Sequence, residues 1–362
     1  MNAIDRLGQR LLFTLDPETA HGLSIKALKC GLPVAARPPV DRRLKVRACG
    51  LDFPNPLGMA AGYDKNGEVP DALLNLGFGF AEIGSVTPLP QPGNPKPRIF
   101  RLTKDEAVIN RLGFNNEGHV RCEERLAARA GRPGIVGVNI GANKDSADRI
   151  ADYGLGVKRF ARYASYLTVN ISSPNTPGLR NMQARTELAE LLSRVTAARA
   201  ALADGAGRKT PLFLKIAPDL AEAELEDIAA EVAAAAIDGV IVSNTTISRP
   251  TLQSVALSGE AGGLSGKPLF ERSTTVLAKM RRLVGPDLAL IGVGGVNSAE
   301  TALEKIRAGA DLVQLYTGMI YAGPALPGRI VGDMARFAER EGLSSIGSLR
   351  DSRLDHWAAK PL

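Results

Sequence analysis

The strongest constraint on the fold is one pattern that recurs eight times from about residue 54 onward. A short apolar or β-branched run ends in small polar residues, and a helical stretch rich in Ala, Leu, Glu and Arg follows it. Strands that alternate with helices in this way form parallel sheets, because each helix returns the chain to the same end of the sheet. Eight such units in one domain-sized block favour a closed (β/α)8 TIM barrel over an open doubly wound sheet.

The predicted strands share an apolar run bounded by Gly, Asn, Ser or Thr. They span residues 56–62, 80–86, 134–141, 166–172, 211–217, 239–245, 289–296 and 312–317. The predicted helices span residues 68–76, 118–130, 147–165, 185–203, 219–236, 267–284, 298–308 and 324–341. The carboxyl ends of all eight strands meet at one face of a barrel, so we expect the functional residues there.

The connection after the second predicted strand, residues 87 to about 118, is far longer than the roughly two to six residues usual for such loops. Two apolar segments flank residues 103–106 and predict a β-hairpin. We expect this hairpin to lie over the mouth of the barrel as a lid. A lid of this kind indicates a site from which water is excluded.

Polar residues gather at the predicted strand ends. A single amide in such a position usually satisfies loop backbone, but five strands share the feature. These residues are Asp64, Lys65, Asn66, Asn139, Asn170, Ser173, Lys215, Ser243, Asn244 and Thr245. Strands seven and eight end in Gly292–Gly295 and Tyr316–Gly318, and we expect each to open a short helix whose first N–H groups could hold a phosphate. Close backbone packing at the rim is the alternative explanation of the glycines.

A phosphate at that end, together with Lys215, Asn139 and Asn170, forms a set of donors suited to a flavin. A lysine beside the pyrimidine side of the flavin ring would stabilise the anion that forms when the ring accepts a hydride. The alternative for Lys215 is a lysine that reaches the rim. Its apolar neighbours in FLKIAPD favour the buried interpretation.

Composition limits the remaining possibilities. The 362 residues are 44% hydrophobic and 23% charged, which is typical of a globular protein with a sizeable core. The three cysteines form no CxxC pair, so we expect neither a disulfide framework nor a metal site. The pattern of a signal peptide and a run long enough to span a bilayer are both missing from the sequence, so we expect neither export nor a transmembrane helix.

The net charge of +7 is concentrated near the start of the chain, where residues 1–48 hold nine Lys or Arg against four Asp or Glu. These basic residues are not interleaved with aromatic residues and no nucleic-acid motif is present, so we expect no nucleic-acid partner. Residues 4–15 carry an apolar stripe at helical spacing, and residues 16–18 provide helix-start chemistry for a second helix to about residue 28. The two amphipathic helices could pack on the barrel or form an interfacial patch on an anionic membrane. A Pro-rich linker at 36–43 divides this extension, residues 1–40, from a catalytic domain at 41–362.

The motifs AAGYDKNG, GSVTP, QPGNPKPRIFRL, NRLGFNN, VNISSPNTPGLR, LKIAPD, SNTT, GGLSG, GVGG and LYTG occur in this order over nearly the whole chain. In these motifs the chain resembles the dihydroorotate dehydrogenases of the quinone-dependent, membrane-associated class. The resemblance implies a flavin mononucleotide (FMN) barrel that oxidises dihydroorotate to orotate in pyrimidine biosynthesis. Ser173 corresponds to the catalytic base that removes the C5 proton while hydride leaves C6 for flavin N5. Cytosolic relatives use cysteine there, and the three cysteines of this chain lie elsewhere.

The resemblance also implies roles for individual residues. The implied substrate-binding residues are Lys65, Asn110, Arg111, Leu112, Gly113, Phe114, Asn170, Asn175, Asn244 and Thr245. The implied flavin-binding residues are Ala61, Gly62, Lys65, Ser85, Asn139, Asn170, Lys215, Ser243, Gly266, Gly295, Tyr316 and Thr317. His21 and Arg101 correspond to positions along the quinone channel, and the resemblance favours the membrane for the extension. Ser172 receives no chemical role, because alternation along a strand would point it away from Ser173.

We therefore expect a monomeric, peripheral enzyme on the cytoplasmic face of the cell membrane that uses FMN, dihydroorotate and a membrane quinone. A cytosolic flavin barrel that passes electrons to fumarate or to a nicotinamide partner is the second hypothesis. The serine at 173 and the extension at 1–40 argue against it. A lyase or a non-catalytic ligand-binding barrel would need no flavin, and the absorbance of the purified protein would distinguish it.

Overall fold

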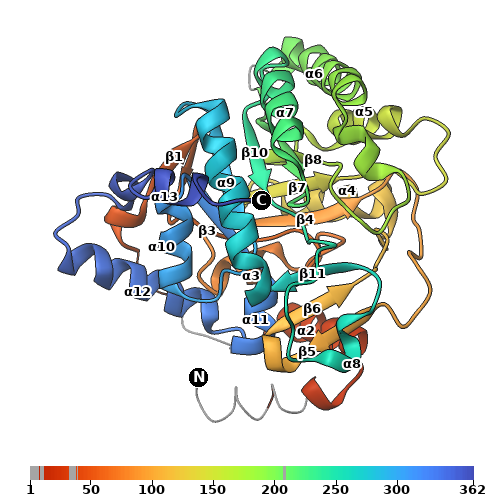
Figure 1. Ribbon diagram of the computed structural model, residues 1–362. Coiled ribbons are helices and arrows are strands. Elements are labelled where there is room, and N and C mark those ends of the chain that lie inside the picture. Colours follow the sequence, from red (N-terminus) through yellow and green to blue (C-terminus); the bar gives the residue numbers. More distant parts are fainter. Residues whose placement is uncertain (1–7, 9–11, 32–37, 39, 207–208) are drawn as a thin grey trace.

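Eight parallel strands close into one barrel in the structure, a computed structural model that describes residues 8, 12–31, 38, 40–206 and 209–362 (Figure 1). The strands are β3 (Leu57–Met59), β4 (Phe80–Val86), β7 (Ile135–Ile140), β8 (Tyr166–Asn170), β9 (Leu212–Ile216), β10 (Gly239–Val242), β12 (Ala289–Val293) and β13 (Leu312–Leu315). Each strand pairs with its neighbours in chain order, and β13 pairs with β3 to complete the ring. The predicted barrel is confirmed, and each predicted strand contains one of these eight.

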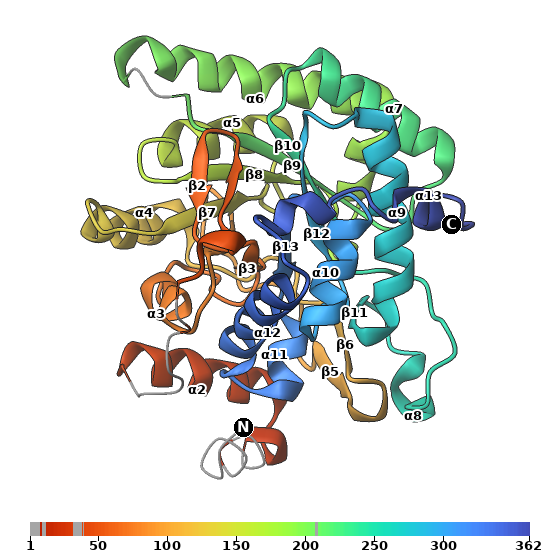
Figure 2. The same cartoon turned by 90° about the vertical axis from the view of Figure 1, so that its left-hand side faces the viewer.

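Helices surround the barrel in both views (Figures 1 and 2). The eight predicted helices are confirmed as α3 (Pro70–Asn75), α4 (Gly118–Arg129), α5 (Arg149–Phe160), α6 (Arg185–Ala206), α7 (Glu222–Ala234), α9 (Phe270–Val284), α10 (Ala299–Arg307) and α12 (Leu326–Arg340). Shorter helices are α8 (Val255–Ser258), α11 (Thr317–Ala322) and α13 (Leu354–Ala358). Single 3-10 turns are η1 (Arg42–Leu44), η2 (Thr103–Asp105), η3 (Leu179–Gln183), η4 (Lys267–Leu269) and η5 (Ile346–Leu349).

Alternate residues of each strand face the interior of the barrel or its outer helices. On β8, for example, Leu167 and Val169 are wholly buried and belong to the large core shared with the helices. Tyr166 belongs instead to a second cluster inside the barrel. Since side chains alternate along a strand, Thr168 and Asn170 face inward with Tyr166. The interior therefore changes along the strands from aromatic at their amino ends to polar at their carboxyl ends.

Three glycines make room for the aromatic end of the interior. Each lies directly beside an aromatic residue of the neighbouring strand, and a Cβ added to it would lie 2.1 to 2.4 Å from a ring carbon. The pairs are Gly58 with Phe80, Gly137 with Tyr166, and Gly239 with Phe213. A hairpin that we did not predict, β1 (Val46–Ala48) and β2 (Leu51–Phe53), covers this end and brings the Phe53 ring to 5.2 Å from the Phe80 ring. The barrel is thus closed at one end and can hold a ligand only at the other.

The predicted lid hairpin is confirmed as β5 (Ile99–Leu102) and β6 (Ala107–Asn110), which pair in antiparallel register. A third strand, β11 (Gly263–Gly266), pairs with β6 from the connection after β10. We did not predict β11, because its GGLSG sequence has little β propensity. The lid is therefore built from two loops that are distant in the sequence.

The second predicted N-terminal helix is confirmed as α2 (Pro17–Lys29), with the Asp16 carboxylate accepting the N–H groups of Glu18 and Thr19. Its Ile25 and Leu28 are buried in the large core, so this part of the extension packs on the barrel. Most of the first predicted helix, residues 4–15, lies outside the described residues, as do residues 36, 37 and 39 of the linker at 36–43. In the ranges that are described, no helix is both long and apolar enough to cross a membrane.

One expectation about the strand ends was wrong. The helix after β12 does not open at the glycine pair but begins at Ala299, and the side chains of Ser298 and Thr301 cap its first N–H groups. After β13 the expectation is confirmed, since α11 starts at Thr317 directly after Tyr316 and has no side-chain cap. The two strand ends differ because a loop, residues 294–298, separates β12 from the start of α10, whereas α11 follows β13 almost directly.

We predict that Gly137→Ala destabilises the fold by about 1–3 kcal/mol, because the new methyl group would overlap the Tyr166 ring. Gly154→Ala is the matched control. Gly154 lies inside α5 with no neighbouring atom within 4 Å of an added Cβ, so alanine should stabilise the helix by up to about 1 kcal/mol. Denaturant unfolding of both variants tests the difference, and equal stabilities would contradict the packing account.

Candidate active site

A cavity of about 740 Å³ lies at the carboxyl ends of the barrel strands, beneath the lid and beside α2. Most of the predicted site residues line it: Lys65, Asn110, Leu112, Gly113, Phe114, Asn170, Ser173, Asn175, Asn244 and Thr245, then Ala61, Gly62, Ser85, Lys215, Ser243, Gly266, Gly295, Tyr316 and Thr317, and finally His21 and Arg101. Asn139 and Arg111 are not part of the lining. The volume falls in the range of about 300–1,000 Å³ typical of small-molecule sites.

Ser173 lies in the loop that follows β8 and is only 5% exposed. Within the described chain, its hydroxyl oxygen makes one hydrogen bond, accepting the backbone N–H of Asn175 at 3.2 Å. The Asn175 side chain donates in turn to Asn110 of the lid at 3.3 Å. The N–H donation favours negative charge on the serine oxygen, and the hydroxyl proton is left free to point into the cavity.

The floor of the cavity is a continuous set of amides and hydroxyls. The Asn170 side chain donates to the Asn139 carbonyl oxygen at 3.0 Å and to Ser85 at 2.8 Å. Ser172, which we did not predict to take part, donates to Asn170 at 3.0 Å and accepts from Asn244 at 3.0 Å. Asn139 therefore lies behind the lining and supports it. Ser172 is likewise not part of the lining, and its lack of a chemical role stays a prediction, although it supports Asn170 and Asn244 through these two bonds.

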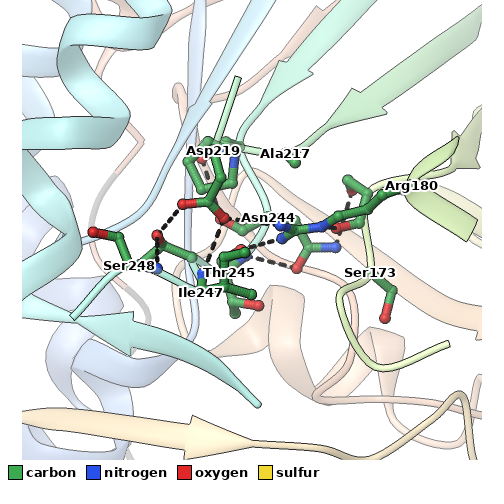
Figure 3. A network of polar contacts seen from close by, with 12 residues as sticks. Ser173, Arg180, Ala217, Asp219, Asn244, Thr245, Ile247 and Ser248 are labelled. Atoms are coloured by element: carbon green, nitrogen blue, oxygen red, sulfur yellow. Dashed lines mark hydrogen bonds and ion pairs between the residues drawn. The ribbon is translucent and has the colours of Figure 1, made fainter. Parts of the chain in front are cut away.

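An ion pair between Arg180 and Asp219 braces the loops that carry these groups (Figure 3). Arg180 also donates to the backbone carbonyls of Ser172, at 3.0 Å, and Thr245, at 2.9 Å. Asp219 accepts the N–H of Ile247 at 2.9 Å. The brace joins the ends of three strands and so sets the spacing between Ser173 and the residues that follow β10. Sequence reasoning missed both charges, although each ends one of the motifs quoted above.

The lid packs closely against the site. Gly263 of β11 lies against Thr245, whose hydroxyl oxygen would be 1.9 Å from an added Cβ. That hydroxyl is buried and has no hydrogen-bond partner among the described residues, so it is available to a ligand. Phe114 lines the cavity with φ of 55°, a strained value for a bulky residue and one that is frequent at functional sites. Arg111 instead pairs with Glu260 at 2.7 Å, and its part in substrate binding stays a prediction.

Two lysines, the partly buried Lys65 and the buried Lys215, bring positive charge to the cavity. Burial lowers the pKa of Lys65 to about 8, and its ammonium lies 3.3 Å from Nε2 of His21. Burial, and secondly the Lys65 charge, lower the pKa of His21 to about 3, so the imidazole is neutral at physiological pH. Burial also lowers the pKa of Lys215, which is 4% exposed on β9. Such shifts are frequent where groups bind or transform a ligand.

The opposite part of the cavity is rich in glycine. Gly266, Gly294 and Gly295 adopt φ values of 94°, 109° and 74°, which favour glycine and let the backbone face the cavity closely. Thr317, at the uncapped start of α11, lies beside them, with its hydroxyl 2.9 Å from that of Ser265. Backbone N–H groups at such a site are suited to a phosphate.

The third part of the cavity lies beneath α2 and is mainly apolar and aromatic. Nδ1 of His21 lies 3.3 Å from the Tyr316 hydroxyl, and the Tyr63 ring packs edge-on against the imidazole at 5.2 Å. Arg101 of β5 donates to the carbonyls of Phe13 at 3.1 Å and Leu15 at 2.6 Å. The lid and the N-terminal segment are thus tied together at this entrance.

Comparisons with known proteins agree over almost the entire chain. The sequence profile of the family described as "Dihydroorotate dehydrogenase" matches residues 43–337. A protein from Mesorhizobium japonicum named "Dihydroorotate dehydrogenase (quinone)" is 78% identical over all of both chains. A relative of the same name from Chelativorans sp. is 65% identical over 100% of this chain and 99% of its own.

Solved structures give the same result. A structure of DHODH from Eimeria tenella in complex with ferulenol has a TM-score of 0.88 and 40% identity, and covers 94% of this chain and 96% of its own. The ligand-free form from the same organism has a TM-score of 0.88 and 41% identity, over 96% of this chain and 100% of its own. With its closed barrel, its full-length relatives and its matching profile, this chain belongs to the dihydroorotate dehydrogenase family and is an oxidoreductase of the quinone-dependent group.

Proposed function

We propose that this enzyme oxidises dihydroorotate to orotate with FMN as its cofactor, uses Ser173 as the catalytic base, and serves a quinone at a membrane surface. Dihydroorotate oxidation in pyrimidine biosynthesis follows from the family, and the finer assignments are the proposal. The observation that carries it is the continuous cavity that joins Ser173 and its amides, the glycine-rich end, and the aromatic entrance beneath α2.

The residues of the cavity fit FMN. The glycine-rich end, Gly266, Gly295 and Thr317, suits the phosphate, and Lys215 supplies a buried positive charge for the ring. Asn170, Ser85 and Ser243 offer amide and hydroxyl groups, with Asn139 supporting them from behind, while Ala61, Gly62 and Tyr316 add lining without further charge. When bound, FMN would supply the hydride acceptor and the electron carrier to the quinone.

Ser173 would remove the proton from dihydroorotate. Serine is a weak base at its ordinary pKa and needs support from its surroundings. The support available here is the Asn175 N–H, which donates to the serine oxygen, and the lid, which excludes water. Lys65 would neutralise the substrate carboxylate, and Asn110, Asn175, Asn244 and Thr245 would hydrogen-bond the ring edge. Leu112, Gly113 and Phe114 would close the lid over the substrate.

The quinone would enter beneath α2, past His21 and Arg101. Leu15 and Leu23 are exposed beside this entrance, at 39% and 42%, although they are large and apolar. Lys26 on the same helix is exposed and basic. An apolar surface with basic neighbours suits an anionic membrane surface, and we propose that the enzyme binds the cytoplasmic side of the cell membrane in this way.

We expect Ser173→Ala to bind FMN and orotate normally but to lose at least about 10²–10⁴-fold in dihydroorotate oxidation, because only proton removal is lost. Ser173→Cys should retain part of the activity, since a thiol can also act as a base. Anaerobic stopped-flow measurement of flavin absorbance separates these variants. Wild-type rates in Ser173→Ala would show that Ser173 is not the base.

Orotate affinity should fall as the pH rises through about 8, because burial lowers the pKa of Lys65 to about 8 and the ammonium loses its proton above that value. A lysine with its ordinary pKa would keep its charge to about pH 10.4. Titration of orotate between pH 6 and 10 should show a decrease of up to about tenfold per pH unit above the pKa. Lys65→Met should bind orotate weakly and with an affinity that does not change in this pH range. If its orotate affinity fell with pH as that of the wild type does, Lys65 would be excluded as the source of the pH dependence.

Leu23→Glu should weaken binding to anionic vesicles by about tenfold or more, because a buried leucine contributes about 1.5–3 kcal/mol. It should also slow reoxidation of the flavin by a long-tailed quinone while leaving flavin reduction by dihydroorotate unchanged. Leu155→Glu is the control, since Leu155 is 51% exposed on α5, away from α2 in both views (Figures 1 and 2). Equal vesicle binding by the two variants would contradict the proposed membrane surface.

A further inference from the structure

Glu82 is a carboxylate at the centre of the barrel and is wholly buried. It lies on β4, two residues after Phe80, so it faces inward directly above the aromatic layer. Neither the motifs nor the strand ends identify it, because it lies in the middle of a strand. A buried charged group is costly unless it is paired and fully hydrogen-bonded, so its surroundings are informative.

Three strands donate hydrogen bonds to Glu82. Asn139 donates to Oε1 at 2.8 Å, while the Tyr166 hydroxyl, at 3.0 Å, and the Gln314 amide, at 2.9 Å, donate to Oε2. Burial and the charge of Glu82 raise the pKa of Tyr166 well above its ordinary value, so the phenol keeps its proton and remains a donor. The charge of Glu82 also acts on Lys215, where it opposes the lowering of the pKa by burial.

The contact with Asn139 determines the orientation of the next amide. An ionised carboxylate only accepts hydrogen bonds, so Asn139 turns its NH₂ group toward Glu82 and its oxygen toward the cavity. That oxygen accepts from Ser85 and, at 3.0 Å, from Asn170. Asn170 consequently presents its own oxygen on the side of the loop that carries Ser172 and Ser173.

The same direction of donation continues into the loop after β10. The Asn170 oxygen accepts from the Ser172 hydroxyl at 3.0 Å and from the Ser172 N–H at 3.3 Å. Ser172 accepts from Asn244 at 3.0 Å, and the Asn244 oxygen accepts the N–H of Thr245 at 2.8 Å. From Thr245 to Asn139, each group therefore donates a hydrogen bond to the next, and this hydrogen-bond chain ends at the Glu82 carboxylate.

We infer that Glu82 is a positioning residue that fixes the donor direction of this hydrogen-bond chain and thereby decides which amide and hydroxyl groups the cavity presents to its ligands. Glu82 does not line the cavity and acts through Asn139 and Asn170. Its negative charge also balances that of Lys215 inside the barrel. The inference rests on the proposed function in one respect, namely that FMN is the ligand with which it is measured.

Glu82→Gln tests this inference because it keeps the shape of the side chain but replaces an acceptor by a donor. If the new NH₂ group takes the position of Oε1, it opposes the Asn139 NH₂ group or forces Asn139 to turn over and oppose Asn170. If it takes the position of Oε2, it opposes the Gln314 NH₂ group instead. We expect the apoprotein to bind FMN at least about tenfold more weakly, since one buried polar group is left unmatched. Tyr166→Phe removes one donor but leaves the carboxylate with two, so FMN affinity should change by less than about twofold.

The double variant Glu82→Gln with Asn139→Asp distinguishes the two explanations most sharply. The carboxylate introduced at position 139 can accept from the amide introduced at position 82, from Ser85 and from Asn170 together, which restores the direction of the chain and the buried negative charge. FMN affinity should recover most of its loss. A role of Glu82 in packing alone predicts equal effects of Glu82→Gln and Tyr166→Phe and no recovery, and either result would overturn the inference.

FMN binding is measured by quenching of flavin fluorescence, and folding of each apoprotein by denaturant unfolding. If Glu82→Gln does not fold, recovery of folding in the double variant supports the inference, and persistent misfolding contradicts it. If the wild-type apoprotein does not bind FMN, the proposed cofactor is wrong. Hydrogen positions from neutron crystallography then decide the Glu82 inference separately, by whether Glu82→Gln turns the Asn139 amide.

Discussion

Closure of eight parallel strands is the constraint on which the rest of this structure depends. A closed barrel has no free edge, so side chains alone decide what fills its interior. The amino ends are filled by Phe80, Tyr166 and Phe213, and each ring fits because the strand beside it carries a glycine. A ligand can therefore enter only at the carboxyl ends, where polar side chains line the cavity and the loops can enclose it.

The enclosed space has two chemically different sides. On one side lie Ser173 and a set of amides whose positions are fixed by the Arg180–Asp219 brace. On the other lie the aromatic and apolar residues beneath α2, with His21 held neutral by burial beside Lys65. The two ligands differ in the same way, because dihydroorotate is polar and charged whereas a quinone is apolar and lipid-soluble. The arrangement explains how one cavity could serve both without a route through the protein for each.

The sequence was sufficient for the barrel, because strand and helix periods repeat and each repeat adds to the same prediction. It was also sufficient for the residues at the strand ends, since resemblance and position agreed on Asn170, Lys215 and Asn244. The supporting contacts of Glu82, Ser172 and Arg180 were missed for a common reason. Each residue acts through contacts between strands that only the closed ring brings together, and a linear pattern contains no sign of them. The hairpin β1–β2 was missed because its strands are short and belong to no β–α repeat, and strand β11 because its glycine-rich sequence has little β propensity.

An anaerobic titration of the purified protein, followed by flavin absorbance, measures both halves of the reaction in one sample. Dihydroorotate should bleach the flavin with formation of an equal amount of orotate, and a long-tailed quinone should then restore the absorbance. Fumarate and NAD⁺ should not restore it. A colourless protein, or a flavin that dihydroorotate leaves unbleached, would contradict the central claim that this cavity joins dihydroorotate oxidation to quinone reduction.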